Sequence, residues 1–383
     1  SGKSVKIVQN ILEKYLKGDR VIWYVIILLS LYSIIMAYSS SSNLAYRLMD
    51  GDATPYLFKH AMILIVGIVM IVYLQFFNYK YFSRLSQLGI YVSVLLLVVT
   101  LLFGVNKGNA SRWIMGFQPS DLAKVVCIIY VARMVVLKKD VIKDFKLGVV
   151  PIVWPVLLIC TLIVPADFST AALLLVVSFI LIFVAGAKLA HLMAIIGGAI
   201  VLFGMALLIN VAIPGFLPRV DTWSKRLTSY ESGNEGENYQ AQMAKRAVAT
   251  GFLQGKGPGK GNIKNNLYSA QSDFIYASSI EEFGSVIGGL GVLFLYLILL
   301  FRVIKIMTKT DGEFGGYMSF GLGFLLVFQA MINMGVGVNL LPVTGQPLPL
   351  LSMGGTSILF TCLSLGIILN VSRTIYTDKT VVI

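Results

Sequence analysis

Charged residues are scarce in this chain. Only 13% of its 383 residues are Asp, Glu, Lys or Arg, whereas 57% are hydrophobic. Soluble domains contain about 25% charged and about 45–50% apolar residues, so this chain has too little polar surface to cover a soluble globule. Intrinsic disorder is excluded as well, because it requires low hydrophobicity and a high density of charge. The composition therefore predicts a membrane protein that crosses the bilayer many times.

Cysteine and histidine are also rare. The three cysteines are Cys127, Cys160 and Cys362, and the two histidines are His60 and His191. The sequence contains no CxxC pair and no Cys/His spacing, which disfavours a disulfide scaffold, a zinc site and a haem attachment site. Each cysteine lies in or beside an apolar run, where a free thiol usually behaves as a small hydrophobic side chain.

Long apolar runs are plentiful. Ten of them approach the length of about 20 residues that a transmembrane helix needs. They cover residues 21–38, 58–76, 88–103, 120–137, 149–164, 168–185, 191–213, 285–304, 317–340 and 350–371. We therefore expect an all-α polytopic membrane protein with ten transmembrane helices, built as a single integral membrane domain over residues 1–383.

The net charge of +13 is distributed between the apolar runs and does not form one patch, so it does not indicate binding of nucleic acid. Eighteen Lys and Arg residues belong to the two termini and the short loops of one side, against four in the short loops of the other. Positive charge is enriched on the cytoplasmic side of membrane proteins. Both termini are therefore expected in the cytoplasm.

One connection is much longer than the others. Residues 214–284 join the seventh and eighth expected helices on the extracytoplasmic side, and long loops in compact proteins are usually functional. Within them, Tyr239, Met243 and Ala247 recur at helical spacing. This spacing predicts a helix that lies on the membrane surface.

A glycine-rich basic stretch follows this predicted helix. Its letters, GFLQGKGPGKGNIKNN, match neither the Walker phosphate loop nor GxGxxG, so a nucleotide site is disfavoured. Two interpretations remain open. Lys256, Lys260 and Lys264 could contact an anionic headgroup or a pyrophosphate, or they could be ordinary lysines of a solvated turn.

Acidic residues near membrane spans are costly and are therefore functional candidates. Asp121 and Lys124 are three residues apart at the start of the fourth run, on one face of a helix. They could serve a function or form a structural ion pair. Asp167, in VPADFST, could likewise be functional or could cap the following helix.

Asp273 has a different context, because it precedes an apolar stretch at the return of the long connection and lies eight residues before Glu281 and Glu282. Partial desolvation raises the pKa of a carboxylate, which suits a general base. The long connection contains no histidine, so a nucleophilic triad is not available there. A pair of carboxylates, as in glycosidases, could form with Glu281 or Glu282.

The connection between the ninth and tenth runs has three prolines and several glycines but no charge. Irregular backbone at membrane depth is tolerated only where it packs in protein or lines a cavity. The segment could be a re-entrant loop that completes the fold. Its polar residues Asn333, Thr344, Gln346 and Ser352 could equally line a cavity for a lipid headgroup.

Five segments resemble motifs of one family. SRWI with FQPSDLAK resembles RRW and QPSE-x-x-K; PADFSTA resembles PDLGT; and ENYQAQMAKRAVATGFLQGKG resembles a GYQ-to-glycine-rich loop. SDFIYASSIEEFG resembles TDFIF-x-x-x-x-EE-x-G, and the stretch 342–357 resembles PxxGxxLPxxSYGGSS. In this order along the chain, they resemble the SEDS family (shape, elongation, division and sporulation proteins), which includes FtsW and RodA, with FtsW favoured.

The resemblance implies an inverting peptidoglycan glycosyltransferase in the bacterial cytoplasmic membrane, acting on lipid II at the outer face. It implies a class B penicillin-binding protein as transpeptidase partner, together with other cell-division membrane proteins. A divalent cation, Mg²⁺ or Mn²⁺, could assist, although the sequence shows no dedicated cage. Asp273 takes the place of the family's catalytic aspartate. The residues expected to bind substrate are Arg112, Lys124, Asp167, Arg226, Gln240 and Ser352.

The chain departs from the family pattern at several positions. QPSE becomes QPSD at Asp121, Gln271 stands where histidine is common, and SYGG becomes SMGG at Met353. None of these changes removes Asp273. A flippase for lipid II, or another membrane transporter, is the alternative function, because intramembrane Asp121, Lys124 and Asp167 could line a transport pathway. A scaffold for other membrane proteins is a third alternative.

Overall fold

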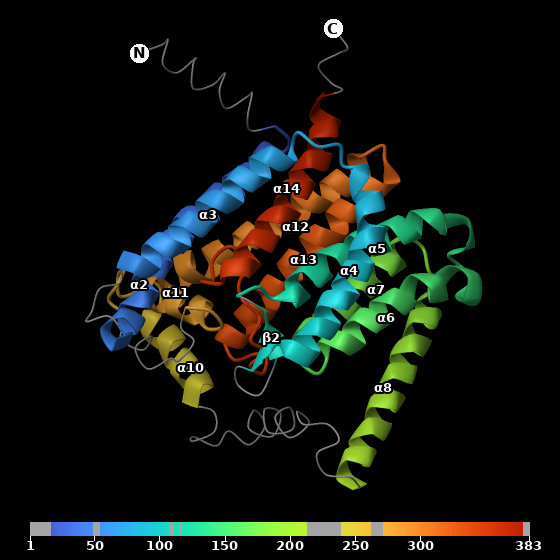
Figure 1. Cartoon of the computed structure of the whole chain (residues 1–383). Coiled ribbons are helices and arrows are strands. Elements are labelled where there is room, and N and C mark those ends of the chain that lie inside the picture. The colour runs from blue at the N-terminus through green and yellow to red at the C-terminus, as the bar shows by residue number, and fades with distance from the viewer. Residues whose placement is uncertain are drawn as a thin grey trace.

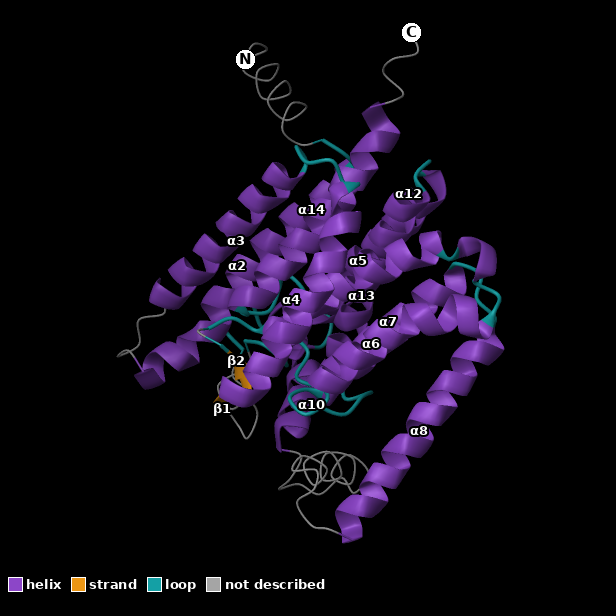
Figure 2. Ribbon diagram, turned by 45° about the vertical axis from the view of Figure 1, so that its right-hand side comes forward, coloured by secondary structure: helices purple, strands orange, loops and turns teal. Residues whose placement is uncertain are grey.

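The computed structural model describes residues 17–48, 54–106, 111–114, 116–212, 239–261 and 271–377, and these residues form a bundle of helices (Figures 1 and 2). Each of the ten expected runs falls on a long helix or on a continuous pair of helices. These are α2 (Arg20–Leu48), α3 (Thr54–Leu74), α4 (Tyr81–Phe103), α5 (Pro119–Leu137), η2 (Phe145–Val149) with α6 (Val150–Ile163), α7 (Phe168–Val184), α8 (Leu189–Ala212), η4 (Ser285–Gly291) with α12 (Val292–Lys309), α13 (Glu313–Gly337) and α14 (Gly355–Thr377).

The remaining elements are short. A hairpin of β1 (Val105–Asn106) and β2 (Ser111–Trp113) connects α4 to α5, and the 3-10 helix η1 (Lys139–Val141) follows α5. Two further helices, α10 (Tyr239–Gly251) and α11 (Ile275–Gly284), precede η4. The all-α expectation is therefore correct apart from this small hairpin.

Seven helices in the described part of the chain are long and apolar enough to cross a membrane. They are the apolar portions of α2, α3, α4, η2 with α6, α11 through α12, α13 and α14. Helix α7 and the apolar part of α8 are shorter, and α5 carries Asp121, Lys124 and Arg133 within its 19 residues. The chain is thus a multi-pass helical membrane protein, and the count of ten spans stays a prediction.

The bundle has two ends that are useful for orientation. We call the end where α2 begins and α14 finishes the terminal end, and the end that carries β1 and β2 the hairpin end (Figures 1 and 2). Helix α8 leans away from the other helices toward the hairpin end in both views.

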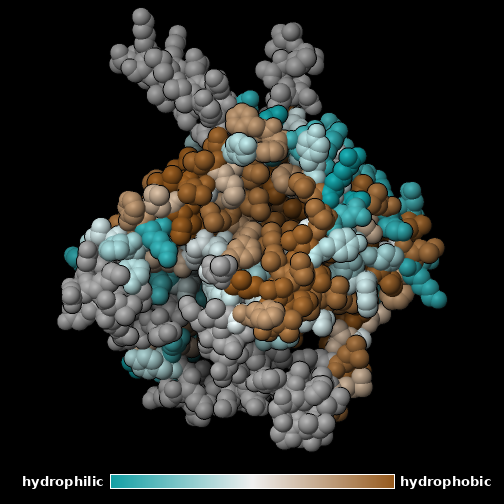
Figure 3. Space-filling view, viewed as in Figure 1, coloured by the Kyte–Doolittle hydropathy of each residue, from teal (hydrophilic) through white to brown (hydrophobic). Residues whose placement is uncertain are grey.

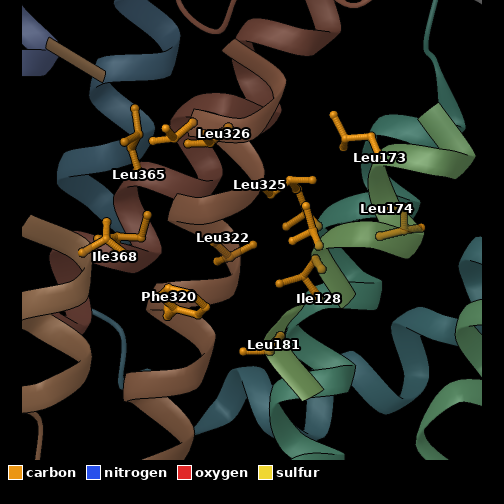
Figure 4. Close-up of a cluster of buried hydrophobic side chains, with 14 of the residues drawn as sticks. Ile128, Leu173, Leu174, Leu181, Phe320, Leu322, Leu325, Leu326, Leu365 and Ile368 are labelled. Carbon is orange, nitrogen blue, oxygen red and sulfur yellow. The ribbon is translucent and has the colours of Figure 1, made fainter. Parts of the chain in front are cut away.

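Helix α13 occupies the middle of the bundle and packs against α5, α7, α12 and α14. Apolar side chains from α5, α7, α13 and α14 converge around it, among them Ile128, Leu181 and Leu322 (Figure 4). Small residues allow the close approach: a Cβ at Gly321 would lie 2.6 Å from a methyl carbon of Ile128. Glycines at helix crossings are typical of membrane bundles, where packing drives association.

The outer surface of the bundle is strongly apolar. Val69 on α3, Leu88 and Leu95 on α4, and Phe301 on α12 are all exposed. In Figure 3, hydrophobic side chains cover much of the visible face, and hydrophilic ones gather toward its margins. A surface of this kind requires a lipid environment.

The apolar run 275–309 is not one straight helix. Gly284, at the end of α11, has φ +77, a left-handed conformation that glycine adopts without strain. Ser279 and Gly288 lie on opposite sides of Gly284 in the chain, and the Ser279 hydroxyl donates to the Gly288 carbonyl at 2.8 Å. In a straight helix, residues nine positions apart would be separated by about 13 Å along the axis. Helix α11 therefore folds back against η4, which brings the turn before α11 onto the bundle.

Helix α10 is present where the spacing predicted it, but its surroundings differ from the expectation. Met243, Ala244 and Ala247 are buried in a cluster with Phe274 before α11 and Val336 of α13. The apolar face of α10 thus packs on protein and is not free to lie on the membrane surface. This helix covers the turn that contains Asp273.

At the terminal end, α14 holds the last turn of α3. The Asn370 amide donates to the carbonyls of Leu74 and Phe77, the latter at 2.8 Å, and Arg373 donates to the Gln75 carbonyl. These donors bond to carbonyls at the end of the helix, where the regular intrahelical donors are missing.

Candidate active site

The turn before α11 is anchored residue by residue. The Gln271 carbonyl accepts from the Met353 amide at 2.9 Å, and the Ser272 carbonyl accepts from the Ser352 hydroxyl at 2.7 Å. The Asp273 carbonyl accepts from the side-chain amide of Asn333 at 3.1 Å. Three consecutive carbonyls are therefore fixed, and the half-buried side chain of Asp273 projects from a backbone that has little freedom to move.

The partner of this turn is the α13–α14 connector, residues 338–354. Its backbone is irregular, and side chains of the surrounding helices supply donors to it. The Gln329 amide donates to the Pro347 carbonyl at 2.8 Å, Asn333 donates to the Gln346 carbonyl at 2.8 Å, and the Tyr296 hydroxyl donates to the Pro349 carbonyl. The connector thus packs in protein, as irregular backbone at this depth requires.

Asn333 joins the two segments in addition to the direct contacts that Ser352 and Met353 make with the turn. Its side-chain amide donates both to Asp273 and to Gln346, and the residue is only 1% exposed. One α13 side chain therefore bonds to the Asp273 turn and to the connector at the same time. Leu350 in the connector has φ +64, and strain of this kind in a non-glycine residue often accompanies a functional site.

Gly345 of the connector lies beside the Asp273 carboxylate. It has φ +71, and a Cβ at this position would lie 3.9 Å from Oδ2 of Asp273. Glycine adopts this backbone conformation without strain, and its missing side chain leaves space next to the carboxylate.

Several acceptors near this turn have no hydrogen-bond partner in the described part of the chain. They are Oδ1 of Asn333, Oγ1 of Thr344 and Oε1 of Gln346, and all three atoms are buried. A buried acceptor without a partner costs free energy unless a ligand or water supplies a donor. The hydroxyl and amide groups of a sugar are donors of the required kind.

Asp121 and Lys124 form the ion pair that their spacing predicted. Nζ of Lys124 lies 2.9 Å from Oδ1 of Asp121 and 3.4 Å from Oε1 of Gln329, and the pair is buried at the start of α5. The predicted ion pair is therefore present. Gln329, which accepts from Lys124, also donates to the Pro347 carbonyl, so the pair is linked to the connector through this one side chain.

Asp167 caps α7, in agreement with one of the two expectations. Its side chain accepts from the Thr170 amide at 3.2 Å, and it is 5% exposed. The Thr170 hydroxyl in turn accepts from the Gln346 amide at 2.8 Å. The start of α7 is thereby joined to the connector.

The glycine-rich stretch packs over the end of α11. Lys256 forms an ion pair of 2.7 Å with Glu281, while Glu282 accepts from the Ser39 hydroxyl and from the Gly259 amide, the latter at 3.0 Å. Both glutamates are buried. They hold this stretch and α2 in place. The carboxylate pairing with Asp273 that their spacing left open stays a prediction.

The lysines of this stretch differ in their surroundings. Lys256 is engaged with Glu281, Lys260 is exposed, and Lys264 lies outside the described residues. The exposed position of Lys260 agrees with the interpretation of this stretch as a solvated turn.

Three of the other expected substrate contacts belong to separate parts of the structure: Ser352 to the connector, Gln240 to α10 and Arg112 to β2. The Ser352 hydroxyl is buried and bonded to both Leu348 and Ser272, so it supports the turn directly. Gln240 is half-buried in the first turn of α10. Arg112 lies in β2, where the structure describes its backbone alone, and Arg226 lies outside the described residues.

Two residues of the network were not foreseen from the sequence. Gln329 contacts both Lys124 and the connector, and Thr170 receives the amide of Gln346. Gln329 left a signal, because a glutamine inside an apolar helix is costly in a membrane and needs a partner.

The side chains that could bind a metal ion are dispersed in the part of the chain that the structure describes. Across residues 17–48, 54–106, 111–114, 116–212, 239–261 and 271–377, no three His, Cys, Asp or Glu side chains gather to hold an ion. These residues do not fit a dedicated metal cage.

Two solved structures resemble this fold. One is a chain of a peptidoglycan synthase complex that coordinates polymerization and crosslinking. It has a TM-score of 0.73 and 24% identity, over 95% of this chain and 100% of that one. Rod shape determining protein RodA of Thermus thermophilus has a TM-score of 0.65 and 22% identity, over 95% and 99%. These two structural similarities establish the fold of this chain.

Sequence relatives extend over nearly the whole chain. Stage V sporulation protein E of Bacillus subtilis is 33% identical over 370 residues, covering 93% of this chain and 97% of the relative. Probable peptidoglycan glycosyltransferase FtsW of Geobacter sp. (strain M18) is 30% identical over 369 residues, covering 92% and 96%. A family model described as cell cycle protein, for FtsW, RodA and SpoVE, matches residues 19–377. The chain belongs to this FtsW, RodA and SpoVE family of cell cycle proteins.

Proposed function

We propose that this protein is a peptidoglycan glycosyltransferase that polymerises lipid II into glycan strands. Relatives named as peptidoglycan glycosyltransferases support the activity. The observation that carries the proposal is the anchored turn, in which three consecutive carbonyls are held and the Asp273 side chain is left half-buried beside Gly345.

In the proposed reaction, Asp273 takes the proton of the acceptor sugar's 4-hydroxyl. The hydroxyl oxygen then bonds to the anomeric carbon of the donor with inversion. The bond from that carbon to the pyrophosphate oxygen breaks, and undecaprenyl pyrophosphate leaves with the electron pair. A general base acts efficiently only when it is held within hydrogen-bond reach of its proton. The contacts of Asn333 and Ser352 supply that fixed position.

The leaving pyrophosphate requires positive charge. Lys124 is already bonded to Asp121 and Gln329, so most of its charge is compensated inside the protein. Arg112 and Arg226 are therefore the stronger candidates of the three cations expected from the sequence. Asp167, Gln240 and Ser352 stay predicted substrate contacts, with Asp167 and Ser352 acting at least through the positions they fix.

A divalent cation at the pyrophosphate stays a prediction. Because the described residues do not fit a dedicated cage, we assign no step of the reaction to a metal.

We further propose that the hairpin end faces the outside of the bacterial cytoplasmic membrane. The excess of Lys and Arg in the loops and termini of the other side supports this orientation, with both termini in the cytoplasm and ten spans. The 214–284 connection, which includes Asp273, would then be extracytoplasmic.

A class B penicillin-binding protein is the proposed partner, because polymerised strands need a transpeptidase to join them. The resemblance to a chain from a polymerization and crosslinking complex agrees with this partner. The FtsW relatives favour a division-type role, in company with other cell-division membrane proteins, over the elongation-type role of RodA.

Transport of lipid II is the alternative function. The buried ion pair of Asp121 and Lys124 is the observation that favours it, because charged groups inside a bundle can line a pathway. Reconstituted vesicles separate the two functions. Headgroup translocation without polymer, lost in Lys124→Met but kept in Asp273→Ala, would favour transport.

The direct test uses the purified chain with its class B partner and labelled lipid II. We expect Asp273→Ala to abolish glycan polymer. Asp140→Ala, which removes an exposed carboxylate at the terminal end, is the matched control and should polymerise normally. Undiminished polymer from Asp273→Ala would refute the assignment.

A further inference from the structure

A second cleft lies at the terminal end, far along the bundle from the Asp273 turn. Its volume is about 580 Å³, and it is formed by the α3–α4 connection, the α12–α13 connection and the last turns of α14. The residues that line it include Phe76, Phe77, Lys80, Lys309, Asp311 and Arg373. Its volume is within the range of about 300–1,000 Å³ that is typical of small-molecule sites.

The charge of this cleft is predominantly positive. Lys80, Lys309 and Arg373 face a single carboxylate, Asp311. Among the described residues, no carboxylate lies within ion-pair distance of the ammonium groups of Lys80 and Lys309, and both lysines are exposed. Two cations are therefore left for an anion, which they would hold by charge and hydrogen bonds.

The walls of the cleft are fixed by packing. Tyr79 is buried against the α12–α13 connection and the start of α13. The packing leaves no room for a side chain at two glycines, because a Cβ on Gly312 would collide with the Tyr79 hydroxyl and a Cβ on Gly315 would lie 2.9 Å from the Tyr79 ring. Burial, and next the charge of Asp311, raise the pKa of the Tyr79 phenol, so the phenol stays neutral. Arg373 is held in place by its bond to the Gln75 carbonyl. The cleft is thus preformed.

One lip of the cleft is apolar. Phe76 and Phe77 are 60% and 45% exposed, and they follow directly after α3, whose outer face is lipid-facing. A ligand in this position meets aromatic side chains on its membrane side and lysines on its water side. An amphiphile with an anionic head matches both, whereas a soluble anion would use the lysines alone.

We propose that this cleft binds the phosphate headgroup of an anionic phospholipid from the adjacent leaflet, with the acyl chains beside Phe76 and Phe77. Basic pockets between membrane helices on the cytoplasmic side are suited to such headgroups. The proposal is independent of the glycosyltransferase activity, because it involves none of the residues at the Asp273 turn.

Native mass spectrometry of the full chain in detergent tests the site. Phosphatidylglycerol and phosphatidylcholine with identical acyl chains are added in turn. We expect the protein to retain more phosphatidylglycerol than phosphatidylcholine. In Lys80→Gln/Lys309→Gln, the loss of each lysine should lower the affinity of the protein for phosphatidylglycerol about fivefold. Lys143→Gln/Lys146→Gln, which removes two exposed lysines elsewhere at the terminal end, is the control and should keep the wild-type affinity.

Three results would overturn the proposal. The first is equal retention of the two lipids, and the second is an equal loss of affinity in the two double variants. The third is displacement of phosphatidylglycerol by glycerol phosphate at similar concentration, which would assign the cleft to a free phosphate compound.

Discussion

Asn333 provides the sharpest perturbation of the proposed active site, because one amide group holds both sides of it. Asn333→Ala removes the donor to Asp273 at 3.1 Å and the donor to Gln346 at 2.8 Å. Hydrogen bonds between membrane helices contribute about 0.6 kcal/mol on average and up to about 1.7, so the two together contribute about 1–3 kcal/mol of stability. The effect on catalysis should be larger, because a misplacement of about 1 Å can lower a rate about 100-fold.

The control for this variant is Asn370→Ala. Asn370 is also a buried asparagine whose amide bridges two carbonyls, those of Leu74 and Phe77, but it lies at the terminal end. Thermal unfolding in detergent should show a similar loss of stability for both variants.

The decisive assay is the rate of lipid II polymerisation per folded molecule. We expect Asn333→Ala to lower it at least tenfold and Asn370→Ala to leave it near the wild-type value. Equal rates in the two variants would show that the position of the Asp273 turn does not limit the reaction, and the reasoning would be wrong.

Two further variants test neighbouring parts of the network. Gly345→Ala should add about 1–2 kcal/mol of backbone strain and crowd the Asp273 carboxylate, so the rate of polymerisation should fall severalfold. The control is Gly186→Ala, because Gly186 has φ +105 and open space around it. This change should add similar strain without changing the rate of polymerisation. A loss of rate in both, or in neither, would contradict this account. Lys124→Met leaves Asp121 buried without its cation, which should cost about 3–5 kcal/mol, and Asp121→Leu/Lys124→Met should recover most of it in unfolding measurements. A double variant as unstable as the single one would argue against the ion pair.

The sequence alone predicted the features that depend on local spacing. The ion pair of Asp121 and Lys124 follows from their separation of three residues on a helix, and the capping role of Asp167 follows from its place before a helix. The positions of the long helices follow from apolar runs in the same way. In each case the partners are neighbours in the chain, so no knowledge of the fold is required.

The contacts that assemble the site could not be predicted in this way. Asn333 and Asp273 are 60 residues apart, and Gln346 and Thr170 are 176 apart. The sequence marked Asn333 and Gln346 as polar residues of a cavity or of a structural loop. In the structure both hold segments together, and each has one acceptor atom without a partner among the described residues. Only the packing of the helices decides which polar groups meet.

The path of the chain after Asp273 was equally hidden. Apolar composition continues from α11 into α12, so the pattern does not reveal that Gly284 lets α11 fold back. That reversal is the reason that α10 packs on α11 and α13 and does not rest on the membrane surface.

The most direct test of the central claim compares binding with chemistry in Asp273→Asn. This change removes the proton acceptor while keeping the size of the side chain and the backbone carbonyl that Asn333 holds. We predict that lipid II binds with an affinity within about threefold of wild type, while polymerisation falls about 100-fold or more, as expected for loss of a general base. Polymerisation at the wild-type rate, or a loss of binding that accounts for the whole loss of activity, would contradict the role of Asp273 as the base.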